Sequence, residues 1–221
     1  GWNTGAAGPN EEVGAGAPIS RQRARDLVRN NPYASSAVEA LASALVGDGI
    51  RPQVQIPRKV TIRAKRASAR WAVGEMVPAA EYVEYLWDRW QRECYRSSPL
   101  GFYGLQSVAA RAMFEAGECL IRFRAARSED GLTVPVQVQI LESEFLDDSR
   151  SGPASNGYMV QGVQFDAVDR RLGYWPYPRH PGESYGGGSM ASAFVPAEVI
   201  AHVYDPTHGR PGQVRGMPPL V

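Results

Sequence analysis

The apolar positions change their spacing near Gly117, and this change divides the chain into two parts. Before Gly117, apolar residues recur every three or four positions, which is typical of amphipathic helices. After it, they alternate with polar residues in CLIRFRA and VPVQVQILES, as in strands that bury one face. We therefore expect an α+β fold in which N-terminal helices precede a mostly antiparallel β-sheet, and not alternating βαβ units.

The N-terminal residues predict an arm followed by two helices. Residues 1–19 are rich in Gly, Ala and Pro and have few apolar anchors, which predicts a flexible arm. Ser20 is a suitable cap for a helix over residues 21–29. Asn31 is a suitable cap for the next helix, with Pro32 at the first helical position, where no backbone N–H is needed.

The second of these helices has an apolar stripe and a clear stop. Val38, Leu41 and Leu45 have the spacing of one buried helix face. Gly47 and Gly49 follow, and Gly47 predicts the C-terminal end of the helix. These glycines do not form a phosphate-binding loop of the GxxxxGK[ST] type, because they follow a helix and no Lys-Ser/Thr pair comes after them.

The remaining helical part and the β part follow in order. Residues 50–70 predict an extended, basic segment, and Pro78 predicts the start of a helix that ends before residues 98–101. Another helix is expected over 103–116. We expect one region over 20–221, helical over 20–116 and β-rich over 117–221, with residues 158–167 as one β segment.

The composition limits the function classes. An apolar fraction of 43% in 221 residues is enough for a core, and no apolar run is long enough to span a membrane. A net charge of +1 argues against a strongly basic nucleic-acid binder, so any DNA contact must come from a local patch. The first residues contain neither Met nor a signal pattern, so we expect a fragment or a processed N-terminus.

Two groups of cations are the candidate contact residues. Arginine supplies nearly all the positive charge, since Lys59 and Lys65 are the only lysines. Guanidinium groups suit both phosphates and acidic residues of a neighbouring subunit. The expected subunit-interface or DNA-backbone contacts are Arg21, Arg23, Arg25 and Arg29, together with Arg58, Lys59, Arg63, Lys65, Arg66 and Arg70.

No pattern predicts a catalytic, cofactor or metal site. His180, His202 and His208 lack the spacing of a helical metal pair. An acidic group stands at a strand end, where carboxylates commonly face solvent, and consists of Glu142, Glu144, Asp147 and Asp148. Glu115 and Glu118 are expected to be structural or exposed, and the only cysteines, Cys94 and Cys119, to be buried thiols.

Two other function classes remain open. A metal-dependent hydrolase or nuclease would use Glu142, Asp147, His180 and His202, because such side chains can assemble in space without a sequence motif. A simple DNA-binding module would use the basic stretch over 58–70 and would show a steep salt dependence.

Several stretches carry motifs in a fixed order. They are RARDLVRNNPYASSAVEALASALVGDGIRP, LWDRWQREC, GFYGLQSVAARAMFEAGECLIRF, VQVQILESEFLDD, GVQFDAVDRRLGYWPYPRHPG and FVPAEVIAHVYDPTHGRPGQVRGMPPL. Over about residues 20–220, this series resembles the portal proteins of lambda-type tailed bacteriophages. The matching part of the family is the N-terminal, wing-forming part, and the stem, clip and crown are not evident in this sequence.

The resemblance implies a structural role without covalent chemistry and without a cofactor. Such portal proteins form a ring, usually of twelve subunits, at one capsid vertex. The terminase motor pumps the genome in through the ring, and the DNA leaves through the same channel into the tail. The implied partners are other copies of the chain, terminase, connector and capsid proteins, and double-stranded DNA bound without sequence specificity. The implied location is the virion, with assembly in the host bacterial cytoplasm.

Overall fold

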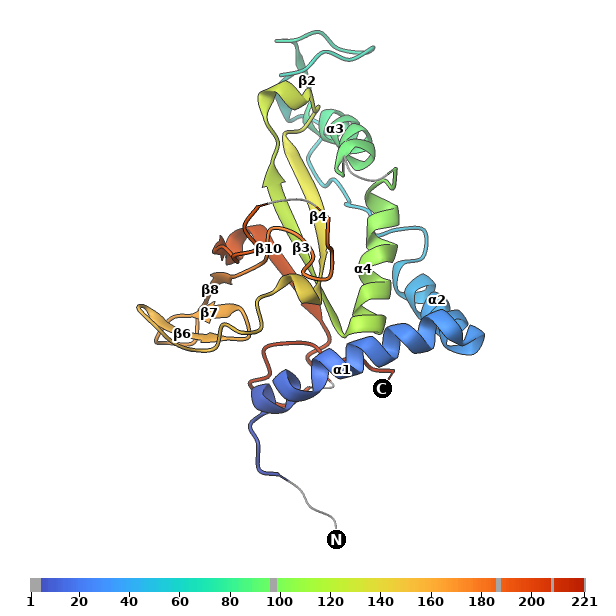
Figure 1. Cartoon of the computed structure of the whole chain (residues 1–221). Coiled ribbons are helices and arrows are strands. Elements are labelled where there is room, and N and C mark those ends of the chain that lie inside the picture. The colour runs from blue at the N-terminus through green and yellow to red at the C-terminus, as the bar shows by residue number, and fades with distance from the viewer. Residues whose placement is uncertain (1–4, 96–98, 186–187, 208, 221) are drawn as a thin grey trace. The chain divides into compact units, whose positions relative to one another are not determined.

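The computed structural model describes residues 5–95, 99–185, 188–207 and 209–220 (Figure 1). The chain forms two compact units that alternate along the sequence. Unit 1 contains the described residues up to Val46, Ser107–Arg122 and the described residues from Ile140 onward. Unit 2 contains Gly47–Gln106 and Phe123–Gln139. The helices and the mostly antiparallel strands confirm the α+β fold.

The first helix, α1, spans Pro9–Asn30, so the expected helix start at Ser20 was wrong. Residues 9–19, expected to belong to a flexible arm, are helical, whereas residues 1–4 lie outside the described residues. Proline at the helix start and two acidic residues in the first turn favour this N-terminus. The buried face repeats every three or four positions and consists of Val13, Ala17, Arg21, Ala24 and Val28. Small residues on this face concealed the periodicity.

The second helix, α2, spans Pro32–Val46 and has the expected ends. Asn31 Oδ1 accepts the backbone N–H of Tyr33 at 2.9 Å, which confirms the cap. Gly47 follows with φ +54°, a left-handed conformation that ends the helix. The expected stripe was only partly right: Val38 is buried, but Leu41 and Leu45 are 45% and 52% exposed, and Ala42 and Val46 are buried in their place.

Unit 2 contains a β-hairpin, whose first strand lies in the segment over 50–70 that was expected to be extended. Strands β1 (Thr61–Arg63) and β2 (Met76–Pro78) pair antiparallel, with Ile62 opposite Val77. Helix α3 follows directly as Ala79–Glu93. Helix α4, Phe102–Ala116, confirms the expected helix over 103–116 and continues from unit 2 into unit 1.

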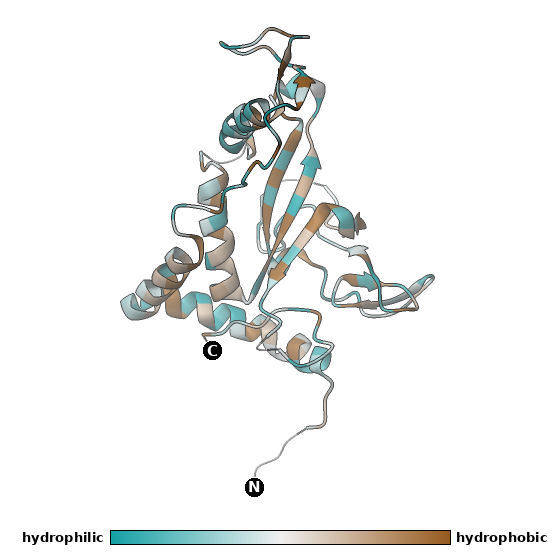
Figure 2. Ribbon diagram, turned by 180° about the vertical axis from the view of Figure 1, so that it is seen from behind, coloured by the Kyte–Doolittle hydropathy of each residue, from teal (hydrophilic) through white to brown (hydrophobic). Residues whose placement is uncertain are grey.

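A three-stranded sheet has the order β10-β3-β4. Strand β3 spans Glu118–Ala125, β4 spans Val136–Glu142 and β10 spans Ile200–Tyr204. Hydrophobic and hydrophilic residues alternate along most of β4 and the second half of β3, as the sequence pattern predicts (Figure 2). Three short 3₁₀ helices also occur: η1 (Ser128–Asp130), η2 (Ser143–Phe145) and η3 (Ala197–Val199).

A separate five-stranded antiparallel sheet in unit 1 has the order β5-β6-β7-β8-β9. Its strands are Gly152–Ala154, Gly157–Val160, Val163–Phe165, Arg171–Tyr174 and Val195–Pro196. The expected single β segment over 158–167 was wrong, because Gln161 and Gly162 have φ +47° and +81° and form a two-residue turn between β6 and β7.

The core of unit 1 lies on strands of both sheets. It contains Leu120, Leu141, Leu146, Val163, Phe165, Tyr174, Val195, Ile200 and Val214. Cys94 and Cys119 are free and buried, which confirms the expected buried thiols, and burial raises the pKa of the Cys119 thiol to about 12. Among the described residues, no helix is both long and apolar enough to cross a bilayer.

Candidate functional site

Glu118 is a fully buried carboxylate at the first position of β3. Its Oε1 accepts hydrogen bonds from Arg21 Nη2 at 2.8 Å and from Arg215 Nε at 2.7 Å. Its Oε2 accepts the backbone N–H of Gly216 at 2.7 Å and lies 2.8 Å from His202 Nε2. Each oxygen therefore has two partners, which offsets the loss of hydration. Burial favours the neutral acid, but Arg215 and His202 outweigh it and hold the pKa of Glu118 well below its usual range.

Arg215 connects Glu118 to a second carboxylate. Its side chain is fully buried, and Nη1 donates to Asp148 Oδ1 at 2.5 Å and to the Gln161 carbonyl at 2.8 Å. Nη2 donates to the Ser143 carbonyl at 2.9 Å. The guanidinium thus has partners on several sides. We call the whole group the Glu118 cluster: Arg21, Glu118, Asp148, His202 and Arg215.

His202 enters this cluster as a neutral imidazole. Strand β10 pairs with β3 so that Tyr204 is opposite Glu118, which places His202 two positions along on the same face. Its Nδ1 lies 3.2 Å from Arg171 Nη1, which can only donate, so Nδ1 accepts and Nε2–H donates to Glu118. Burial lowers the pKa of His202 by more than the neighbouring carboxylate raises it.

Two glycines allow the backbone to reach Glu118. Gly117 has φ +84°, and a Cβ there would lie 2.2 Å from the carbonyl carbon of Met217. A Cβ on Gly216 would lie 2.1 Å from the Gly117 carbonyl oxygen. Larger residues at either position would separate these backbones. The glycines therefore permit the short hydrogen bond from Gly216 N–H to Glu118.

The Glu118 cluster joins parts of unit 1 that are far apart in sequence. Arg21 comes from α1, Glu118 from β3 and His202 from β10, whereas Arg215 comes from the C-terminal segment. The hydrogen bond from Arg21 to the Gly216 carbonyl spans 195 positions. Glu118, expected to be structural or exposed, is structural and buried.

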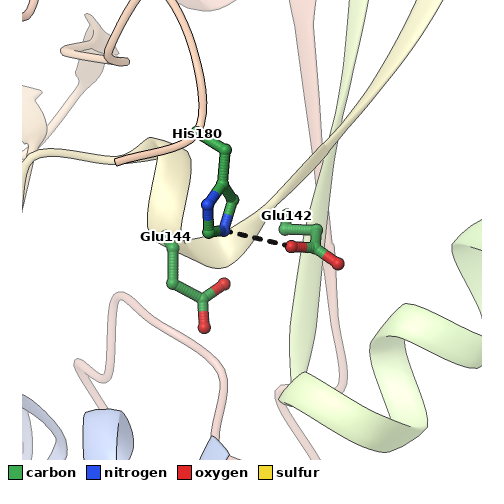
Figure 3. A group of neighbouring side chains, drawn as sticks. All are labelled: Glu142, Glu144 and His180. Carbon is green, nitrogen blue, oxygen red and sulfur yellow. Dashed lines mark ion pairs between the residues drawn. The ribbon is translucent and has the colours of Figure 1, made fainter. Parts of the chain in front are cut away.

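A second group contains Glu142, Glu144 and His180, whose potential ligand atoms all lie within 4.8 Å of one another (Figure 3). His180 Nε2 is 3.2 Å from Glu142 Oε2. Arg25 donates to both oxygens of Glu144, at 2.6 and 2.8 Å, and lies 3.6 Å from Glu142. The Arg25 guanidinium already supplies a positive charge to both carboxylates, whereas His180 Nε2 is buried and makes no hydrogen bond with a described residue.

The four residues of the hydrolase hypothesis belong to different networks. Glu142 and His180 form the pair above, and His202 belongs to the Glu118 cluster. Asp147 accepts hydrogen bonds from Ser149 and Ser192, both at 2.5 Å, which outweigh burial and lower its pKa to about 2. The structure therefore does not bring the four residues into one site. His208, the third histidine considered, lies outside the described residues.

The first candidate group of arginines divides in two. Arg21 is buried among partners of its own chain, and Arg25 is committed to Glu144, so neither is available for another subunit or for DNA. Arg23 and Arg29 are exposed on α1, and Arg29 makes a 3.5 Å ion pair with Asp26. Only this half of the group remains a candidate contact surface.

The second group lies on unit 2, on and around the β1–β2 hairpin. Arg63 donates to the Gly74 carbonyl at 3.1 Å, and Arg70 pairs with Glu81 at 2.7 Å. The other four cations are exposed and make no ion pair with any described residue. We call them the basic segment: Arg58, Lys59, Lys65 and Arg66.

An aromatic contact orders the chain beside this segment. The phenol oxygen of Tyr82 on α3 accepts the backbone N–H groups of Lys65 and Arg66, both at 3.0 Å. Trp71 is nearly buried and packs edge-on against Tyr82 at 5.9 Å between ring centroids. Lys65 and Arg66 therefore project from a backbone that is fixed to α3.

Sequence reasoning missed Arg215, Asp148 as its partner, and Tyr82. Arg215 and Gly216 lie in the closing GQVRGMPPL stretch, and Gly117 and Glu118 lie in the AGECLIRF stretch. The paired glycines were a signal of close backbone approach, but no spacing rule predicts which residues approach each other.

A comparison with known protein families gives a match. The family model described as phage portal protein, lambda family, matches residues 1–221. The comparison with curated proteins found no match. Because the family match extends over the entire sequence, this chain belongs to the lambda family of phage portal proteins.

Proposed function

We propose that the chain is the wing-forming part of a non-enzymatic portal subunit, which assembles into a ring at one capsid vertex. The ring forms the channel for genome packaging and ejection and docks terminase and the head–tail connector proteins. Double-stranded DNA passes through it without sequence-specific contacts. The partner copies close the ring through two different surfaces of each subunit, because repeated head-to-tail contacts related by rotation produce a closed ring.

The observation that carries this proposal is the family match over the whole chain. The structure adds a physical argument, because the motifs of the chain meet in the Glu118 cluster and not in an open reactive site. Such a cluster fixes the geometry of unit 1, because it joins a helix, two strands and the C-terminal segment through Glu118 and Arg215, which have no solvent exposure. Precise geometry is what a subunit needs when small angular errors add around a ring.

The test is the oligomeric mass and shape of the full-length protein. Sedimentation and negative-stain images should show closed rings of about a dozen subunits with a central channel. Images that show only monomers at all concentrations would refute the proposed ring. Titration of the ring with duplex DNA of unrelated sequences should give equal affinities, because a channel lining contacts phosphates and not bases.

A further inference from the structure

A groove on unit 2 already holds one guanidinium group. It has a volume of about 350 Å³ and lies between α3 and the loop that follows β1. The guanidinium of Arg70 stacks on the ring of Trp71 at 5.0 Å and is paired with Glu81 at 2.7 Å. The groove thus shows, in its own structure, the combination of an aromatic face and a carboxylate that binds cationic side chains.

The same groove has unused capacity for cations. Glu84 and Asp88 line it together with Tyr85, and both carboxylates are on exposed positions of α3. Neither makes an ion pair with a described residue of the same copy. Glu81, Glu84 and Asp88 have the i, i+3, i+7 spacing of one helix face, so their charges act in one direction.

The basic segment is the complementary surface on the same unit. Arg58, Lys59, Lys65 and Arg66 are exposed, and they have no carboxylate partner among the described residues. On these two described surfaces of unit 2, each copy therefore presents four cations and two carboxylates without an ion-pair partner. Two different and complementary surfaces on one subunit are what a head-to-tail contact requires.

We infer that the groove formed by Trp71, Tyr85, Glu84 and Asp88 binds cationic side chains of the basic segment of a neighbouring copy. This inference rests on the proposed ring, and it names the surfaces through which the ring closes. Duplex DNA is a less suitable occupant of this groove, since Glu84 and Asp88 repel phosphates. Incoming arginine or lysine side chains extend the stack that Arg70 begins and pair with Glu84 and Asp88.

The two lysines make a direct test possible, because they are the only lysines of the chain. Copies labelled with ¹⁴N and ¹⁵N are mixed before assembly and treated with a carbodiimide, which converts a carboxylate and a nearby amine into an amide. We expect mixed-label peptide pairs that join Lys59 or Lys65 to Glu84 or Asp88. Crosslinks of these lysines that occur only within one copy, or only to other carboxylates, would overturn the inference.

Charge reversal supplies the second test, with ring formation as the measured quantity. Glu84→Lys with Asp88→Lys should abolish rings, and so should Lys65→Glu with Arg66→Glu. The protein that combines all four substitutions should form rings again, because the reversed charges still attract each other. A rescue of this kind distinguishes a direct contact from a loss of folding, and unchanged melting temperatures of the single-sided variants confirm it.

A matched control changes the net charge equally at another place. Glu183→Lys with Glu198→Lys reverses two exposed carboxylates of unit 1, and rings should persist. The inference is overturned if rings persist in both single-sided variants, or if the combined variant does not form rings again. In either case the proposed ring of the wild-type protein is not refuted. Loss of duplex DNA binding without loss of rings in Lys65→Glu/Arg66→Glu assigns the basic segment to DNA and also overturns it. Only an unassembled wild-type protein refutes the proposed function.

Discussion

Glu118 is a carboxylate that folding removes completely from water. The hydration that it loses is replaced by Arg21, Arg215, His202 and one backbone N–H. Removing one charge from such a buried group leaves the opposite charges without compensation, which costs about 3–5 kcal/mol. We therefore expect Glu118→Gln to lower the free energy of unfolding by about this amount, as measured by urea denaturation.

The control for this variant is an exposed carboxylate of the same unit. Glu198→Gln should change the free energy of unfolding by no more than about 0.5 kcal/mol, because Glu198 lies on the surface. If Glu118→Gln were equally mild, the buried ion pairs would contribute little to the stability of unit 1. The Glu118 cluster would then not be the joint that the geometry indicates.

The lowered pKa of His202 predicts that the stability of the fold depends on pH. Its pKa is lowered in the folded state, so below a pH of about 6.5 the unfolded chain takes up a proton that the folded chain does not. The free energy of unfolding should therefore fall as the pH decreases from about 6.5 to 5, by at most about 1.4 kcal/mol per pH unit for this one group. Denaturation curves recorded across this range measure the slope.

The variant His202→Gln should reduce that slope, because glutamine provides a donor and an acceptor but does not titrate. Glu118 and Asp147 do not contribute to this slope. Their pKa values are lowered in the folded state, so their contribution to the free energy of unfolding is lost only below about pH 4. An imidazole signal of His202 that titrates near pH 6.5 in the folded protein would contradict the neutral assignment.

At the scale of elements, the ends of α2 were better predicted than the face that it buries. Asn31, Pro32 and Gly47 act through local hydrogen bonds and dihedral angles, so the sequence alone contains the information. The face that α2 buries depends on neighbouring elements, and there Leu41 is exposed while Ala42 is buried. The length of α1 was missed because its buried positions include two alanines and one arginine, which no apolar periodicity reveals.

The hairpin that carries the basic segment depends on one hydroxyl group. Tyr82 Oη accepts the backbone N–H groups of Lys65 and Arg66. Tyr82→Phe keeps the packing against Trp71 but leaves these two donors without their acceptor. We expect hydrogen exchange at the amides of Lys65 and Arg66 to become faster by about 5- to 10-fold, as for the loss of one hydrogen bond of about 1–1.5 kcal/mol.

The matched comparison is Tyr85→Phe, since the Tyr85 hydroxyl donates a long hydrogen bond of 3.4 Å to the Ala67 carbonyl. This variant should leave the amides of Lys65 and Arg66 unchanged. Equal exchange rates in the wild type and in Tyr82→Phe would show that the loop is held by packing alone. The orientation of the basic segment would then not depend on Tyr82.

At the scale of the whole molecule, the site was the least predictable part. The stretches that carry the motifs are visible in the sequence, but their convergence on Glu118 requires contacts that span from 84 positions, for His202, to 195 positions, for Arg21 with the Gly216 carbonyl. The positions of two arginines were also mispredicted from their charge. Arg21 and Arg25 were expected to contact another subunit or DNA, but they pair with carboxylates of unit 1. The residues next to a buried arginine in the sequence do not distinguish it from an exposed arginine. An arginine with a distant carboxylate partner therefore has no local sequence signal.

The last prediction concerns the salt concentration, because salt should weaken the contact between subunits without unfolding them. Exposed charges are screened when the Debye length falls from about 10 Å at 0.1 M salt to about 3 Å at 1 M, whereas buried pairs are screened much less. A ring that closes through the basic segment, Glu84 and Asp88 should therefore dissociate as NaCl increases over this range, as measured by sedimentation. The denaturation midpoint of the subunit should stay nearly constant, since Glu118 and Arg215 have no solvent exposure. An apolar interface responds in the opposite way, so rings that persist or become more stable at about 1 M NaCl would contradict an electrostatic contact.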